Sequence, residues 1–172
     1  IEGVVVRKVV VGIKPRDINA IYGLADSINS YAELRANATA ELLQEVIATL
    51  CKEGTQWSMS GQEARTFPRN RLKPAAKVWY HFLKSRLMPS THIQTVSRDR
   101  TLLLYCIMTV KPINVGEIIH EEICNCAHKS ADQLWFPSLI SELCEMNGCV
   151  YSDSEERLKV TGAITPTHQT HP

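Results

Sequence analysis

The chain has 172 residues, of which 44% are hydrophobic and 22% charged, so it can bury a domain core and is not a disordered polyampholyte. Its longest apolar stretches, residues 9–11 and 102–108, are far shorter than the roughly 18–20 residues that a membrane span needs. Ile1-Glu2-Gly3 lacks both an initiator Met and a secretory-signal pattern. We therefore expect a piece of a longer intracellular protein, nuclear or cytoplasmic, without a membrane partner.

The net charge of +1 hides an uneven distribution. Residues 65–100 hold nine basic residues against one acidic residue, Asp99, so this segment carries a charge of +8. The rest of the chain holds ten basic and seventeen acidic residues, a charge of −7. Such a segment indicates either a surface that binds a polyanion or a surface that acidic helices of the same protein neutralise. Its basic residues are Arg65, Arg69, Arg71, Lys73, Lys77, Lys84, Arg86, Arg98 and Arg100.

Two segments near the N-terminus predict minor β-structure. The valine-rich residues 4–11 favour one strand or a short hairpin that turns at Arg7-Lys8, although neither residue favours the positive φ of a tight turn. Residues 56–67, with Trp57 and Phe67 around Ser60-Gly61, favour a second small hairpin or an ordered loop.

Apolar residues at helical spacing predict about six helices, near residues 15–22, 33–52, 73–87, 98–110, 114–126 and 136–147. Residues 26–31 are polar and predict a loop. Asn114 and Glu117 have the spacing of a capping box, and Asn147-Gly148 marks the end of the last helix. The predicted fold is mainly α: a single helical domain over residues 1–151, followed by a polar, partly disordered tail at 152–172.

The clearest predicted helix is 73–87, with Pro74 in its first turn. Its predicted core face holds four residues within about 60° of one direction, with three more beside them. These are Leu72, Ala76, Trp79 and Leu83, then Ala75, Phe82 and Leu87. Arg86 also points into this face. Another face carries Lys73, Lys77, His81 and Lys84.

Four blocks of residues, taken in order, resemble a known family. They are Leu72-Lys73-Pro74 with Ala76-Lys77, Trp79, Phe82, Arg86-Leu87, Pro89 and His92; Arg98, Arg100, Leu102-Leu103-Leu104-Tyr105 and Ile107; Ile113-Asn114-Val115-Gly116 with Ile118-Ile119; and Phe136-Pro137-Ser138-Leu139-Ile140 with Leu143-Cys144. This pattern resembles the plant transposon protein domain, best over residues 65–148. Similar sequences often have Gly where this chain has Lys8. The resemblance implies a plant origin and a mobile-element history, and it implies no chemistry.

The sequence offers no assembled active site and predicts no cofactor, metal or small-molecule substrate. Cys124, Cys126 and His128 fall at alternate positions, which a helix places on different faces, whereas zinc sites need four converging ligands. The six cysteines are therefore expected to be mostly buried thiols. Glu117 and Glu121 can share a helix face, but the strand-rich framework of a nuclease is absent from the prediction. Ser138 has no neighbouring base.

The function predicted from these residues is non-catalytic. The domain is expected to bind DNA or RNA through a basic surface, or to associate with itself. The predicted nucleic-acid-binding residues are Arg69, Arg71, Lys73, Lys77, His81 and Lys84. The alternative is an accessory subdomain of a larger transposase or nuclease whose catalytic residues lie outside this chain.

Overall fold

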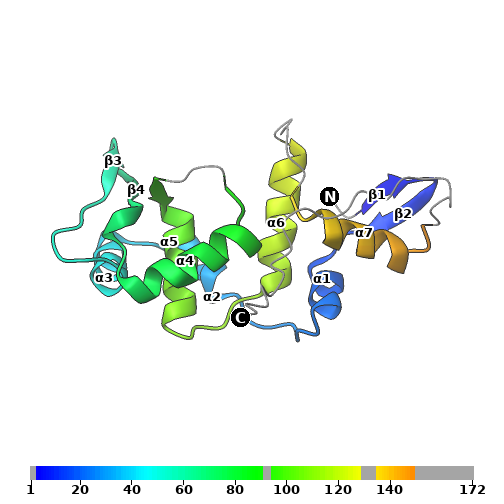
Figure 1. Cartoon of the computed structure of the whole chain (residues 1–172), viewed down its shortest axis with the longest axis horizontal. Coiled ribbons are helices and arrows are strands. Elements are labelled where there is room, and N and C mark those ends of the chain that lie inside the picture. Colours follow the sequence, from blue (N-terminus) through cyan, green and yellow to red (C-terminus); the bar gives the residue numbers. More distant parts are fainter. Residues whose placement is uncertain (1–2, 91–93, 129–134, 150–172) are drawn as a thin grey trace, which may run out of the picture.

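The computed structural model describes residues 3–90, 94–128 and 135–149. The predicted C-terminal tail lies outside these residues. The described part contains seven α-helices, a short 3-10 helix and two small antiparallel sheets (Figure 1). The helices are α1 (Pro15–Ile21), α2 (Ser30–Ala36), α3 (Ala40–Leu50), η1 (Arg69–Arg71), α4 (Pro74–Arg86), α5 (Arg98–Met108), α6 (Val115–His128) and α7 (Pro137–Met146). The mainly helical fold is confirmed.

The seventh helix arises because the segment predicted as one helix over 33–52 forms two. Asn37 ends α2, and Thr39 begins α3 by accepting a hydrogen bond from the Leu42 amide through its side chain (3.3 Å). The first of these helices begins at Ser30, inside the segment predicted as a loop. Tyr31 is therefore a buried helical residue rather than a loop residue.

The N-terminal valines form a hairpin of β1 (Gly3–Val6) and β2 (Val9–Gly12). Its two-residue turn places Arg7 and Lys8 at φ of 50° and 68°, the conformation that such a turn requires. The strain of two non-glycine residues there is tolerated because four cross-strand pairs fix the register around it. Of the two structures that the sequence allowed, a single strand or a hairpin, the chain therefore forms the hairpin.

The second hairpin, near Trp57, is confirmed and belongs to a three-stranded sheet. Strands β3 (Ser58–Ser60), β4 (Glu63–Pro68) and β5 (Thr95–Ser97) lie in that order. The strand β5 was not predicted, because a three-residue strand leaves too short a pattern to recognise. It leads directly into α5.

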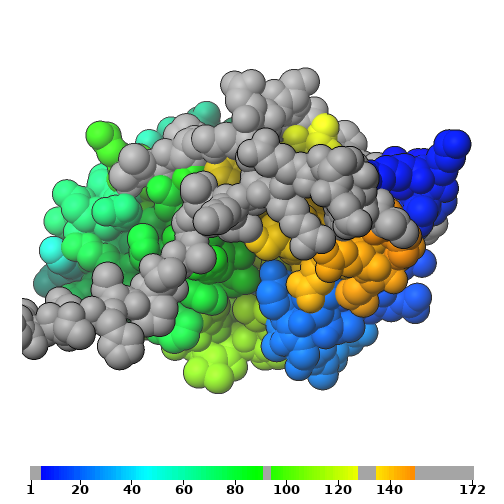
Figure 2. Space-filling model, turned by 45° about the vertical axis from the view of Figure 1, so that its right-hand side comes forward, coloured from blue at the N-terminus to red at the C-terminus, as the bar shows by residue number. Residues whose placement is uncertain are grey.

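The elements gather into two lobes (Figure 1). The central lobe consists of α2, α3, α4, α5 and the three-stranded sheet; the terminal lobe consists of β1, β2, α1, α6 and α7, so it joins the two ends of the described chain. Figure 2 shows the hairpin at one end of the molecule beside α7. Residues from both lobes contribute to one hydrophobic core.

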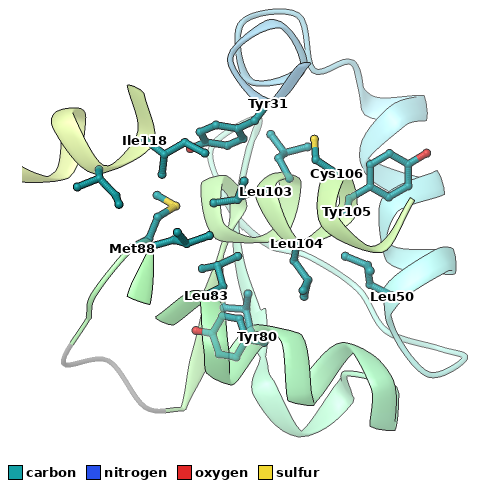
Figure 3. Close-up of a cluster of buried hydrophobic side chains, with 14 of the residues drawn as sticks. Tyr31, Leu50, Tyr80, Leu83, Met88, Leu103, Leu104, Tyr105, Cys106 and Ile118 are labelled. Carbon is teal, nitrogen blue, oxygen red and sulfur yellow. The ribbon is translucent and has the colours of Figure 1, made fainter. Parts of the chain in front are cut away.

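Helix α5 lies at the centre of the core (Figure 3). Six consecutive residues from Thr101 to Cys106 are buried, as the sequence predicted for a helix that is apolar nearly all round. Leu83 of α4, Leu50 of α3 and Ile118 of α6 belong to the same cluster. Four of the six cysteines, Cys51, Cys106, Cys144 and Cys149, are also buried, and no disulfide joins any of the six.

Candidate nucleic-acid interface

The predicted core face of α4 is confirmed in part, because Leu72, Ala76, Leu83 and Leu87 are buried. The buried residues within the helix are Ala76, Tyr80 and Leu83, and the Tyr80 hydroxyl donates a hydrogen bond to the Thr95 carbonyl of β5. The prediction that Trp79 and Phe82 face the core is wrong, since each side chain is 46% exposed. The tyrosine is preferred because its hydroxyl reaches a backbone acceptor, a pairing that buried tyrosines require.

The exposure of Trp79 and Phe82 explains why a charged residue, Arg86, occurs at an apolar position of the predicted helix. The sequence placed its guanidinium within the apolar face, but the part of that face that carries Trp79 and Phe82 is open to water, and Arg86 is exposed. It lies close enough to Tyr22 to lower the pKa of that phenol, against the larger raising effects of burial and of Glu142. Arg86 therefore lies at the surface near Tyr22 rather than within the core.

Two of the predicted binding residues hold the central lobe together. The Lys73 ammonium donates hydrogen bonds to the carbonyls of Ala48 (2.8 Å) and Thr49 (2.9 Å), near the C-terminal end of α3. A cation is favoured at that end of a helix. The Arg71 guanidinium donates to the Thr55 hydroxyl and to the Glu53 carbonyl in the loop that follows. These contacts give Lys73 and Arg71 structural roles.

Two further basic residues of the +8 segment contact groups of their own chain, and a third is half-buried. Arg65 forms an ion pair with Glu63, two residues earlier on β4 (3.0 Å). Arg100 donates hydrogen bonds to the carbonyls of Met88 and Pro89 and to the Ser97 hydroxyl. Arg98 is half-buried, and its Nε has no hydrogen-bond partner.

The other basic residues of the segment stay at the surface. Arg69, Lys77, His81 and Arg86 are exposed, and Lys84 is half-buried. In the described parts of the chain, no carboxylate oxygen lies within 4 Å of the charged nitrogens of Arg69, Lys77, Lys84 or Arg86. Lys77, His81 and Lys84 share one face of α4, as predicted from their spacing. A positive surface formed by α4 and η1 is thus left without ion-pair partners among the described residues.

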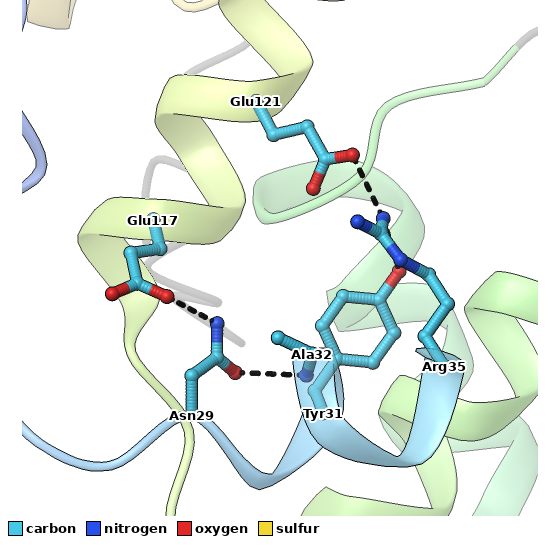
Figure 4. A network of polar contacts seen from close by, with 6 residues as sticks. All are labelled: Asn29, Tyr31, Ala32, Arg35, Glu117 and Glu121. Carbon is cyan, nitrogen blue, oxygen red and sulfur yellow. Dashed lines mark hydrogen bonds and ion pairs between the residues drawn. The ribbon is translucent and has the colours of Figure 1, made fainter. Parts of the chain in front are cut away.

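Three acidic residues outside the +8 segment are engaged elsewhere, two of which are shown in Figure 4. The Glu117 carboxylate accepts hydrogen bonds from the side-chain amides of Asn29 (2.6 Å) and Asn114 (3.2 Å), while Glu121 pairs with Arg35 of α2 (2.8 Å). The Glu45 carboxylate accepts a hydrogen bond from Tyr105. These carboxylates join α6 to α2 and α3 to α5. They do not neutralise α4.

The carboxylates of the described residues do not converge into a metal-binding group of the kind that a nuclease uses. Asp26 and Glu117 line one open groove of about 720 Å³ between α1 and α6, together with His120. Asp26 is hydrogen bonded to Asn19, and Glu117 to two asparagines. Glu121 points towards Arg35 rather than into this groove. Across the described residues, no group of three His, Cys, Asp or Glu side chains converges on a point that can hold a metal ion.

The buried thiols of Cys51 and Cys106 are poor nucleophiles at neutral pH. Burial raises the pKa of Cys51 and of Cys106 to about 11, and the nearby cations Lys73 and Lys111 lower these values only in part. A thiolate is the nucleophilic form of cysteine, so neither residue is activated at neutral pH. On α6, the Cys124 thiol lies 3.6 Å from the Nε2 of His120. The side chain of His128, the third residue of the candidate metal pattern, lies outside the described part.

Trp79 and Phe82 are the surface residues that sequence reasoning assigned wrongly. Their rings meet edge to face, with centroids 6.0 Å apart and an interplanar angle of 85°. Val78, the next residue along this surface, is 70% exposed. The position of Arg86 in the same face was the available signal, because a charged residue in an apolar stripe indicates that the stripe reaches solvent.

Comparison with family models places the chain in a family. The model described as "Putative plant retrotransposon-related domain" matches residues 2–150. The chain therefore belongs to this family of mobile-element-derived plant domains, which confirms the resemblance seen in the sequence. No curated protein and no solved structure gives a significant match. Within the described residues, no helix is both long enough and apolar enough to cross a bilayer.

Proposed function

We propose that this retrotransposon-related domain binds nucleic acid through a basic surface on α4 and η1. The observation that supports the proposal is that Arg69 and Lys77, which are exposed, and Lys84, which is half-buried, have no carboxylate partner among the described residues. His81 lies on the same face of α4 and adds charge when protonated. A row of cations of this kind binds a phosphate backbone by releasing its condensed counterions.

The test is a binding titration with DNA and RNA oligonucleotides at several salt concentrations. Three permanent cations give a slope of log affinity against log salt of about −2 on a single strand. The variant Lys77→Glu/Lys84→Glu is expected to weaken binding and flatten this slope. Lys73 and Arg71 are left unchanged, because their hydrogen bonds to backbone carbonyls stabilise the fold.

The matched control is Lys14→Glu/Lys111→Glu. It changes the net charge by the same amount at two exposed lysines outside the basic surface. Equal losses in both variants would show a diffuse charge effect and would contradict the assigned surface. Absence of binding by the wild-type domain would reject the function.

Self-association is the second candidate function, and the N-terminal hairpin supports it. Val5 and Val10 lie directly opposite each other in the register and are 68% and 67% exposed. Exposed apolar residues on a two-stranded hairpin with unpaired edges favour pairing with another strand. Sedimentation of the wild type and of Val5→Thr/Val10→Thr tests this candidate, because a monomeric wild type at high concentration rejects it. The alternative of an accessory subdomain in a larger transposase rests on the mobile-element family alone.

A further inference from the structure

Trp79 and Phe82 form an exposed aromatic ridge on α4. Each ring is about half exposed, and the contact between them is edge to face. An edge-to-face contact occupies one face of one ring, so the remaining faces can take further stacking partners. Val78, more exposed than either ring, extends the ridge across the outside of the helix. Water therefore covers apolar surface that the core of the domain does not use.

The aromatic ridge and the basic residues lie on the same solvent-exposed side of α4. At 100° per residue, Trp79, Phe82 and Arg86 fall within about 60° of each other. Lys77 and Lys84 lie at the opposite border: the buried residues Ala76, Tyr80 and Leu83 separate them from Trp79 on one side. Around the exposed side they lie about 140–160° from Phe82, with Val78 and His81 between. Because an α-helix with its side chains is only about 10–12 Å wide, one ligand that crosses α4 can contact both borders.

The combination of aromatic rings and cations distinguishes between two kinds of nucleic acid. A duplex presents phosphates to a basic surface, but its bases are stacked within the helix and their faces are hidden. A single strand offers phosphates together with unstacked bases, and these bases stack on exposed aromatic side chains. Lysines alone do not discriminate between the two forms, whereas the rings favour the single strand.

We propose that the ligand of this surface is single-stranded nucleic acid, with bases stacked on Trp79 and Phe82 and phosphates held by Lys77 and Lys84. This inference rests on the proposed function and assigns its ligand class. Arg86, exposed at the same border of α4 as the rings, adds a cation there. Stacking is tolerant of sequence because every base has a π-face, so little base preference is expected.

The test compares oligothymidylate and oligouridylate of 20 nucleotides with a mixed-sequence duplex of equal length. Trp79→Leu keeps an apolar side chain but removes the ring, and Trp79→Phe restores a ring. For Trp79→Leu we expect at least about five-fold weaker binding of both single strands, the lower end of the cost of one lost base stack. Duplex binding is expected to change less than two-fold, and Trp79→Phe is expected to bind as the wild type does.

Phe82→Leu is the second variant and should weaken the same two ligands. The control is Met146→Ala on α7, which removes a side chain of similar exposure outside the basic segment. Thermal melting of each variant shows whether it is folded, and substitution of an exposed ring is expected to leave the melting temperature nearly unchanged.

The outcomes separate this inference from the function on which it rests. If single strands and duplex bind equally, and only the lysine variant weakens them, the stacking surface is overturned while nucleic-acid binding stands. If the ring variants weaken single strands and duplex alike, the preference for single strands is overturned. If no nucleic acid binds the wild type, both proposals fail. If Trp79→Leu instead abolishes self-association and leaves oligonucleotide binding unchanged, a second copy covers the ridge and the inference is wrong.

Discussion

The two lobes are stabilised by different interactions. In the central lobe, α5 contributes an unbroken run of buried side chains, and α2, α3 and α4 pack around it. In the terminal lobe, α1 and α6 meet through buried asparagines. The Asn19 amide donates to Asp26 (2.7 Å) and to Asn114 (2.9 Å), and its carbonyl oxygen accepts from the Gly116 amide (2.7 Å).

The difference shows how the terminal lobe is held together. Apolar packing is tolerant of small changes in shape, whereas a buried polar network requires each donor to meet its acceptor. The close approach of α1 to α6 also requires a glycine at position 116, because a Cβ there would lie 2.1 Å from the Pro15 carbonyl oxygen. We expect the central lobe to tolerate conservative apolar replacements and the α1–α6 contact to tolerate almost none.

The largest expected effect is in the central lobe. Leu104→Ala removes a fully buried side chain at the middle of α5 and leaves a cavity (Figure 3). The free energy of unfolding is expected to fall by about 4 kcal/mol. Urea unfolding followed by circular dichroism measures it. A loss below about 1 kcal/mol would contradict the central position of α5 in the core.

Gly116→Ala should break the α1–α6 contact. The added methyl group meets backbone rather than a movable side chain, so α1 must shift, at a cost of about 3 kcal/mol. Thiol labelling compares the lobes in this variant. Cys144 and Cys149 of the terminal lobe are expected to react earlier than Cys106 of α5, and simultaneous reaction would show that the lobes unfold as one unit.

Asn19→Ala should weaken the same contact by about 2 kcal/mol. The substitution leaves the buried Gly116 amide without its acceptor and removes one of the two donors to the side-chain oxygen of Asn114. The matched control is Asn125→Ala, an exposed asparagine on α6, which is expected to change stability by less than about 0.5 kcal/mol. Equal thermal melting of the two variants would exclude a stabilising role for the buried network.

At neutral pH the smallest effect is the one expected from two thiols of the central lobe, because their loss of stability appears only in alkali. Cys51 and Cys106 have a pKa of about 11 in the folded chain against 9.0 unfolded, because burial disfavours the thiolate. The folded state therefore binds protons more tightly, so this contribution is complete below pH 9 and is lost as the pH rises towards 11. Urea unfolding from pH 8 to 11 tests it. Cys51→Ala/Cys106→Ala should flatten the dependence, and an unchanged slope would contradict the assignment to these thiols.

Much of the fold followed from the sequence alone, for local reasons. The signals that begin or end a helix act on residues only a few positions away. Examples are Pro74 in the first turn of α4, Asn114 with Glu117 at the start of α6, and Gly148 after α7. The apolar run of α5 predicted its buried central position for the same kind of reason. The sequence also located the positive charge on residues 65–100. Family membership followed from residues in four blocks along the chain.

Tertiary structure decided how these elements face one another. The sequence could not tell that α4 buries Tyr80 and leaves Trp79 exposed. Which of the two rings is buried depends on an acceptor carbonyl in β5, farther along the chain. Nor could the sequence tell that Lys73 and Arg71 satisfy carbonyls near the end of α3 while Lys77 stays in solvent. Charge and apolarity are properties of residues, but exposure and pairing are properties of the contacts between distant segments. The sequence determined which residues are available to a ligand surface, and only the packing of α4 decided which of them face outward.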